Sequence, residues 1–287
     1  MFEKMSRSWE LVKASYAVLR QDREMLLFPL LSMLGTIIVT ILFIIPLAST
    51  GIFEAASSEE GMSNAQSITA FVIAFLFYFV TYTVIIFSNV AIVGMAMMRL
   101  RGEDPTVKDG FRIASEHINA ILGYAAISAT IGMILNAIRG NEDNIVGQIV
   151  AGLLGTAWNL ITFLVIPVLV VEGVGPIEGI KRSGSLLKST WGENIVGSFA
   201  MGIISFLVML GAGLIIGLPL FLIASATNSG IIIALAVAII VLMLVAIGLF
   251  FSALNSIFTA ALYNYATGNG AGEFFPEGMI AGAFASK

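Results

Sequence analysis

The sequence has no cysteine and one histidine, and only 11% of its 287 residues are charged. The absence of cysteine excludes disulfides, thiol nucleophiles and thiolate metal ligands. A zinc site needs three or four ligands, so we expect a structural role for His117. Soluble domains carry about 25% charged residues, so most of this surface is expected to face something other than water. The net charge of −4 gives no sign of a nucleic-acid partner.

Long uncharged runs replace the missing charges. Six of them exceed the 20 or so apolar residues that a bilayer requires, at 26–53, 67–98, 118–138, 145–171, 195–225 and 230–265. Backbone hydrogen bonds must close within each span, so the sequence predicts an all-α, polytopic membrane bundle. No Asp, Glu, Lys or Arg lies inside these runs. This pattern argues against a proton-driven transporter, because intramembrane ionisable groups are typical of proton relays.

The basic residues are distributed asymmetrically about the six predicted spans. Thirteen of the 14 Lys and Arg residues fall on one side, and only Arg139 falls on the other. Basic residues favour the cytoplasmic side of a membrane protein. We therefore predict a multi-pass protein of the cell membrane with both termini in the cytoplasm.

A short amphipathic segment precedes each pair of spans. Apolar residues recur at helical spacing within 9–19, 107–118 and 177–191. Each segment carries an acid three residues before a base, at Glu10–Lys13, Asp109–Arg112 and Glu178–Lys181. Such pairs meet on a helix surface, and we expect these helices to lie in the headgroup plane.

The six spans are therefore predicted to form three hairpins, each introduced by an interfacial helix. In this interpretation residues 1–287 form a single integral membrane domain. Its repeat units are approximately 1–98, 99–171 and 172–272, followed by a short C-terminal tail at 273–287.

Three asparagines, Asn89, Asn159 and Asn255, are the candidate polar positions at membrane depth. Each stands 13 or 14 residues before a glycine, at Gly102, Gly173 and Gly268 respectively. Two interpretations are open. The amides could line a polar pocket or substrate path, or they could form interhelical hydrogen bonds, which is the commoner role of amides in bundles.

Small residues recur every four positions in two of the spans. Gly147, Ala151 and Gly155 lie in the fourth span, and Gly213 and Gly217 lie in the fifth. This spacing lets helices approach closely. It favours packing within the chain over dimerisation.

Motifs that would indicate an enzyme are absent from the sequence. Neither a nucleophile elbow nor a Walker-type loop occurs. The carboxylates Glu103, Asp104 and Asp109 share a loop with Lys108 and Arg112, so mutual neutralisation is expected there rather than a metal site. We predict no catalytic residue, no cofactor and no bound metal.

Several segments resemble a known family. They include SWELVKAS at 8–15, PVLVVEG at 167–173 and FTAALY at 258–263. Together they resemble an uncharacterised family of prokaryotic integral membrane proteins, domain of unknown function 6159. The hairpin arrangement also resembles, at the level of the fold, the membrane domain of some glycerophosphodiester phosphodiesterases. Neither family supplies catalytic residues.

These observations favour a non-enzymatic membrane protein that organises lipid or a partner protein. The alternative is a carrier or channel for a neutral or amphiphilic substrate, with a groove lined by the three asparagines. The expected partners are membrane lipid and a membrane protein or second copy of the chain, and no nucleic acid.

Overall fold

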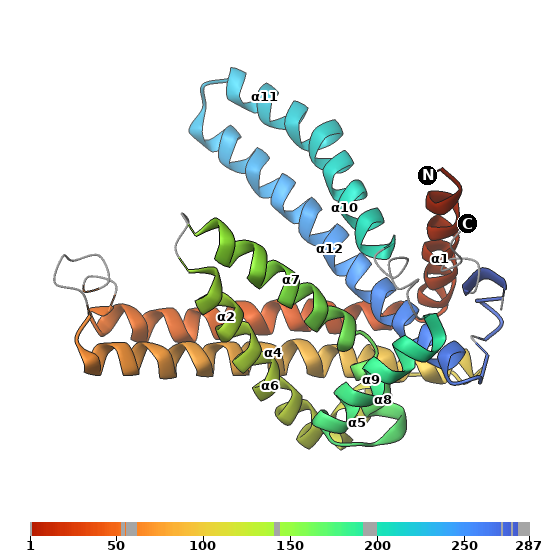
Figure 1. Cartoon of the computed structure of the whole chain (residues 1–287). Coiled ribbons are helices and arrows are strands. Elements are labelled where there is room, and N and C mark those ends of the chain that lie inside the picture. Colours follow the sequence, from red (N-terminus) through yellow and green to blue (C-terminus); the bar gives the residue numbers. More distant parts are fainter. Residues whose placement is uncertain are drawn as a thin grey trace. The chain divides into compact units, whose positions relative to one another are not determined.

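The structure is a computed structural model that describes residues 2–52, 55, 62–140, 144–191, 200–270, 272–276 and 278–280. These residues form helices joined by turns, and none of them lies in a strand (Figure 1). In chain order the elements are α1 (Phe2–Gln21), the 3-10 turn η1 (Arg23–Leu26), α2 (Leu27–Ser49), α4 (Asn64–Leu100), α5 (Val107–Glu116), α6 (Ile118–Arg139), α7 (Ile145–Ile161), α8 (Val165–Glu172), α9 (Pro176–Trp191), α10 (Ala200–Ala212), the π-helix η3 (Gly213–Gly217), α11 (Leu218–Ala226) and α12 (Gly230–Ala266).

Among the residues that the structure describes, six segments are long and apolar enough to cross a membrane: Arg23–Ser49, Asn64–Leu100, Ile118–Arg139, Ile145–Glu172, Ile204–Ala226 and Gly230–Ala266. They confirm the predicted all-α fold with six spans. The first span begins earlier than predicted, at Arg23, and ends earlier, because α2 ends at Ser49 and the chain turns at Gly51, where φ is 65°. The predicted start of the fifth span at 195–199 lies outside the described residues.

A short helix precedes each pair of spans, as the sequence indicates. In chain order α1 comes before α2 and α4, α5 before α6 and α7–α8, and α9 before α10–α11 and α12. The apolar residues of these helices are in part buried against the protein and in part exposed on its surface. On α1, Val12 and Leu19 are buried while Trp9 and Tyr16 are exposed. Contacts with α10 and α12 account for part of this amphipathic pattern.

The long helices α4 and α12 have the same length and the same kind of C-terminal cap. Each has 37 residues. Each ends in a glycine with positive φ, 83° at Gly102 and 77° at Gly268, which only glycine adopts readily. In both caps the residue after the glycine donates to a carbonyl five residues back at 3.0 Å, from Glu103 to Met98 and from Asn269 to Asn264. This Schellman pattern closes the free carbonyls of the helix end.

The chain divides into two compact units. The first comprises Met1–Pro29, Met95–Val107 and Leu187–Lys287, and the second comprises Leu30–Gly94 and Lys108–Leu186. These boundaries do not coincide with the three repeat units, which stay a prediction. In the first unit, α10 and α11 run along α12 (Figure 1). In the second, α2 runs along α4, and α6 packs on α7 (Figure 1).

The small-residue stripes lie at contacts within each unit. Gly147 and Ala151 are buried, and a Cβ built on Gly147 would collide with the carbonyl oxygen of Ile138 on α6. A Cβ on Gly217 would lie 3.4 Å from Cγ2 of Ile240 on α12. Gly213 differs, since a Cβ there would meet nothing within 4 Å. Close packing inside the chain therefore accounts for Gly147 and Gly217.

Two prolines explain the irregular spans. Proline lacks an N–H, and its ring clashes with the carbonyl four residues earlier. Pro167 acts on Phe163, and the fourth span breaks there into α7 and α8, with a turn at residues 162–164. Pro219 acts on Ile215, which lies inside the π-helix η3. Both irregularities follow from residues present in the sequence, although the hydropathy pattern does not show them.

Candidate functional site

A half-open cavity of about 320 Å³ lies within the second unit. Residues from α4, α6, α7, the turn after α7 and α8 line it. They are Tyr82, Ile85, Ile86, Asn89, Tyr124, Ser128, Ile131, Gly132, Leu135, Gly155, Trp158, Asn159, Thr162 and Ile166. The residues of α4, α6 and α7 are in the middle of their spans, so the cavity is at membrane depth.

The cavity wall is uncharged, and polar side chains make up half of its fourteen lining residues. Two phenols, two amides, two aliphatic hydroxyls and one indole contribute to it, and none of the lining residues is Asp, Glu, Lys, Arg or His. Burying an isolated charge in such surroundings is strongly unfavourable. The composition therefore suits an uncharged molecule that forms hydrogen bonds.

Two of the three predicted asparagines meet at this cavity. Asn89 of α4 is half-buried and Asn159 of α7 is exposed. Neither side chain forms a hydrogen bond to another residue in the part of the chain that the structure describes. Interhelical packing through amides would require such bonds. The structure therefore shows no interhelical amide bond at these two residues, and the pocket interpretation stays a prediction.

Asn255 has a different place. It lies on α12 in the first unit, its side chain is exposed, and it does not line the cavity. The groove shared by all three asparagines stays a prediction.

One hydroxyl of the cavity wall is held by the backbone. The Thr162 hydroxyl donates to the carbonyl oxygen of Trp158 at 2.7 Å. This bond fixes Thr162 at the C-terminal end of α7, where it lines the cavity together with Tyr124 and Ser128 of α6.

Another part of the wall depends on a glycine. A Cβ built on Gly132 of α6 would come within 3.3 Å of the Tyr82 hydroxyl on α4. The absence of a side chain on Gly132 therefore leaves room for the Tyr82 phenol in the wall.

The lining aromatic residues were not predicted, but the sequence holds a signal for them. Polar residues recur at helical spacing in the spans, as Tyr124 and Ser128 and as Trp158 and Thr162 do.

The break between α7 and α8 is stabilised by α9. The N–H of Leu164, which the broken helix leaves free, donates to the hydroxyl of Ser183 at 3.0 Å. Both residues are fully buried. Nε of Arg182 also donates to Glu172 at 3.0 Å, which ties α9 to the end of α8. Irregular backbone at membrane depth is tolerated where protein buries it or where it lines a cavity, and this segment meets both conditions.

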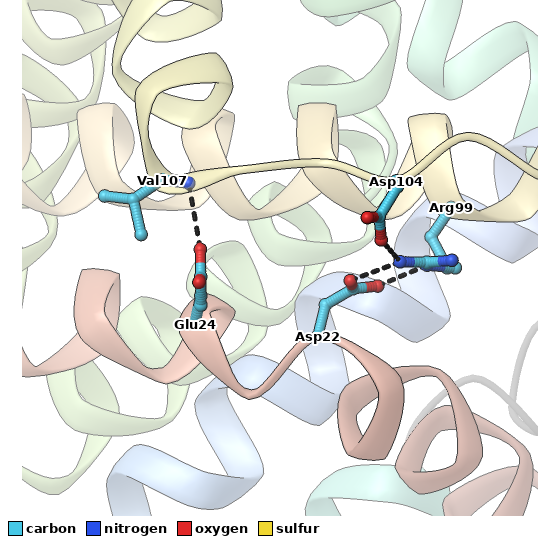
Figure 2. A network of polar contacts seen from close by, with 5 residues as sticks. All are labelled: Asp22, Glu24, Arg99, Asp104 and Val107. Atoms are coloured by element: carbon cyan, nitrogen blue, oxygen red, sulfur yellow. Dashed lines mark hydrogen bonds and ion pairs between the residues drawn. The ribbon is translucent and has the colours of Figure 1, made fainter.

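A cluster of charges in the first unit joins the end of α1 to the end of α4 (Figure 2). Asp22 accepts hydrogen bonds from Nε and Nη2 of Arg99, and Asp104 accepts another from Nη2. Glu24 accepts from the N–H of Val107 at 3.2 Å, at the positive end of α5 (Figure 2). Because its charges satisfy one another, we assign this cluster a structural role.

The three predicted acid–base pairs have different outcomes. Asp109 and Arg112 pair at 3.1 Å on α5. Hydrogen bonds to Asp109 and to Glu116 raise the pKa of Arg112, so its guanidinium stays charged. Among the described residues no ion pair forms within Glu10–Lys13 or Glu178–Lys181, although both pairs lie on helices at the predicted spacing. Exposed side chains gain little from such pairing.

His117 lies between α5 and α6. Its Nδ1 is 2.8 Å from the carbonyl oxygen of Ile113, which fits the structural role expected for it. Within the described ranges, no group of three or more His, Cys, Asp and Glu residues could hold a metal ion.

The six apolar helices define this chain as a multi-pass α-helical membrane protein. The model of a family of unknown function, DUF6159, matches residues 68–274. The chain belongs to this family, as the segment resemblance predicts. No curated protein matches the chain, and the likeness to the membrane domain of glycerophosphodiester phosphodiesterases gains no support.

Proposed function

We propose that this protein binds a neutral or amphiphilic molecule in the cavity between α4, α6 and α7, and carries it without reacting with it. The observation behind this proposal is the pair of amides at Asn89 and Asn159. Both line a cavity at membrane depth, and neither has a hydrogen-bond partner among the described residues. A polar group that lacks both a protein partner and water costs about 1–3 kcal/mol, and a bound molecule would reduce that cost for an amide at membrane depth.

A binding role is favoured over catalysis by the residues of the wall. Ser128 and Thr162 are hydroxyl groups, but neither has a carboxylate or histidine beside it in the lining set. A hydroxyl nucleophile needs an adjacent base for activation. The wall can therefore hold and orient a molecule better than it can cleave one.

The proposal includes the location of the protein. We place it in the cell membrane with both termini in the cytoplasm, because the basic residues of α1, of the loop after α4 and of α9 all fall on one side of the six spans. Membrane lipid is then the surrounding phase from which a ligand is drawn.

Trp158 provides a direct test, because it lines the cavity and the chain has only two other tryptophans. The double variant Trp9→Phe/Trp191→Phe leaves one indole as a reporter. In nanodiscs we expect neutral amphiphiles to change its fluorescence saturably, and charged ones to leave it unchanged. Mass spectrometry should recover the amphiphile chemically unaltered.

Matched leucine variants provide the control. Asn89→Leu or Asn159→Leu in the reporter background should weaken the response, while Asn255→Leu should not, since Asn255 is outside the cavity. The proposal fails if no neutral amphiphile gives a saturable response, or if the recovered molecule has been converted.

A second function is favoured by the exposed apolar residues of the short helices. Trp9 and Tyr16 on α1, Phe111 on α5 and Ile177 on α9 are exposed on helices that also carry basic residues. Such helices could organise lipid or a partner membrane protein, including a second copy of the chain. Proximity labelling in cells would test this function with α1 altered by Trp9→Ser and Tyr16→Ser. An unchanged set of labelled neighbours would contradict it.

A further inference from the structure

We infer that the cavity takes the head of an uncharged lipid, which enters sideways from the bilayer while its chains stay outside. The head would carry hydroxyl or carbonyl oxygens. This inference rests on the proposed function and names the class of ligand.

The depth of the site is the first argument. Asn159 stands 14 residues after Ile145 and 13 before Glu172, the ends of its span. At 1.5 Å per residue along α7 it is about 20 Å from Ile145, and the turn at 162–164 and α8 separate it from Glu172, so it lies inside the hydrocarbon layer of about 30 Å. A water-soluble solute would have to cross hydrocarbon to reach it, whereas a lipid is already there.

The surroundings of Asn159 are the second argument. Its side chain is exposed, and so are Gly152 and Thr156, which share its face of α7. The half-open cavity therefore reaches the outer surface of the span at this point. An amide at such a boundary can bond a lipid head on one side while the attached chains extend into the bilayer.

The size of the cavity is the third argument. Small-molecule pockets usually measure about 300–1,000 Å³ and enclose most of their ligand. The value of about 320 Å³ is at the lower end of that range. The cavity can enclose a compact head group but not the two long chains of a lipid, which must leave through the open side.

The hydrogen-bonding groups define the head. The amides of Asn89 and Asn159, the Tyr82 phenol and the Trp158 indole all line the cavity. Within the described structure none of these four side chains has a hydrogen-bond partner, and together they offer both donors and acceptors. No lysine or arginine is among the lining residues to offset a phosphate. Uncharged hydroxyl and ester oxygens fit this set, and a phosphate does not.

Photolabelling tests the inference with a defined probe. The full chain in phosphatidylcholine nanodiscs would be labelled with photoactivatable dioleoylglycerol, and the labelled peptides identified by mass spectrometry. We expect label on peptides that contain 82–89, 124–135 and 155–166. Unlabelled dioleoylglycerol should compete, while dioleoyl phosphatidic acid and free glycerol should not. Asn89→Leu and Asn159→Leu should each weaken binding about fivefold, and Asn255→Leu should leave it unchanged.

Each outcome has a definite meaning. Competition by free glycerol would overturn the lipid inference while keeping the proposed function, because a water-soluble neutral solute would then occupy the site. Competition by phosphatidic acid would overturn the requirement for an uncharged head. Label that is indifferent to both leucine substitutions would overturn the site itself. Label lost only in the two cavity variants, with competition by dioleoylglycerol alone, would support the inference.

Discussion

The ion pair between Asp22 and Arg99 should contribute strongly to the stability of the first unit. The Asp22 side chain is only 5% exposed and that of Arg99 is 14% exposed. Two unit charges about 4 Å apart attract by about 4 kcal/mol at an effective dielectric constant of 20. Asp22→Asn keeps the shape and removes the charge. Because Arg99 retains Asp104 and some water, we expect a net loss of about 2 kcal/mol.

Asp104→Asn is the matched control. It removes one carboxylate charge next to the Arg99 guanidinium, as Asp22→Asn does, but the Asp104 side chain is 92% exposed. Exposed pairs contribute less than about 1 kcal/mol, so this variant should behave almost as the wild type.

Thermal unfolding of both variants in identical nanodiscs, followed by tryptophan fluorescence, measures the difference. A loss of 2 kcal/mol corresponds to a midpoint about 5 °C lower for a chain of this size. Equal effects from the two substitutions would refute the reasoning, since burial would then not matter. A wild-type midpoint for Asp22→Asn would refute it as well.

Two further predictions concern α9 and the orientation of the chain. Ser183→Ala leaves the buried N–H of Leu164 without a partner and should lower the free energy of unfolding, measured by chemical denaturation, by about 1–3 kcal/mol. Ser185→Ala on the exposed face should lower it by almost nothing, and equal losses would contradict the role of Ser183. Since the chain lacks cysteine, single cysteines can report the orientation. An impermeant maleimide added to intact cells should label Ser63→Cys, in the loop predicted to lie outside, and should spare Ser185→Cys, on the predicted cytoplasmic side. The reverse pattern would place the termini outside.

The spans were predictable because hydrocarbon imposes one solution on any long apolar run. Without water, each backbone segment must satisfy its own hydrogen bonds, so length and lack of charge predict a helix. The ends of α4 and α12 have a different cause, which is also visible in the sequence. Gly102 and Gly268 supply the positive φ that terminates each helix.

The interruption of the fourth span was not predicted, although its cause is in the sequence. Averaged hydropathy treats residues 145–171 as one run, while Pro167 removes one donor and displaces the carbonyl of Phe163. The partner that satisfies the break, Ser183, comes from another helix. That contact depends on tertiary packing, which no local pattern specifies.

The candidate site was predicted in part. Asn89 and Asn159 stand out because amides are costly at membrane depth, and the structure brings both to one cavity. Their spacing before a glycine could not show that Asn255 lies apart from it. Likewise, an amphipathic pattern cannot distinguish a helix face on headgroups from one on protein, and Val12 of α1 is buried while Trp9 is exposed.

In the proposed complex, Asn89 and Asn159 hold an uncharged lipid between α4, α6 and α7. Native mass spectrometry of the purified protein tests it most directly, by comparing the wild type with the variant Asn89→Leu/Asn159→Leu. We predict that the wild type retains an uncharged lipid that the double variant loses, while Asn255→Leu retains it. Identical lipid complements in the wild type and the double variant would contradict the claim.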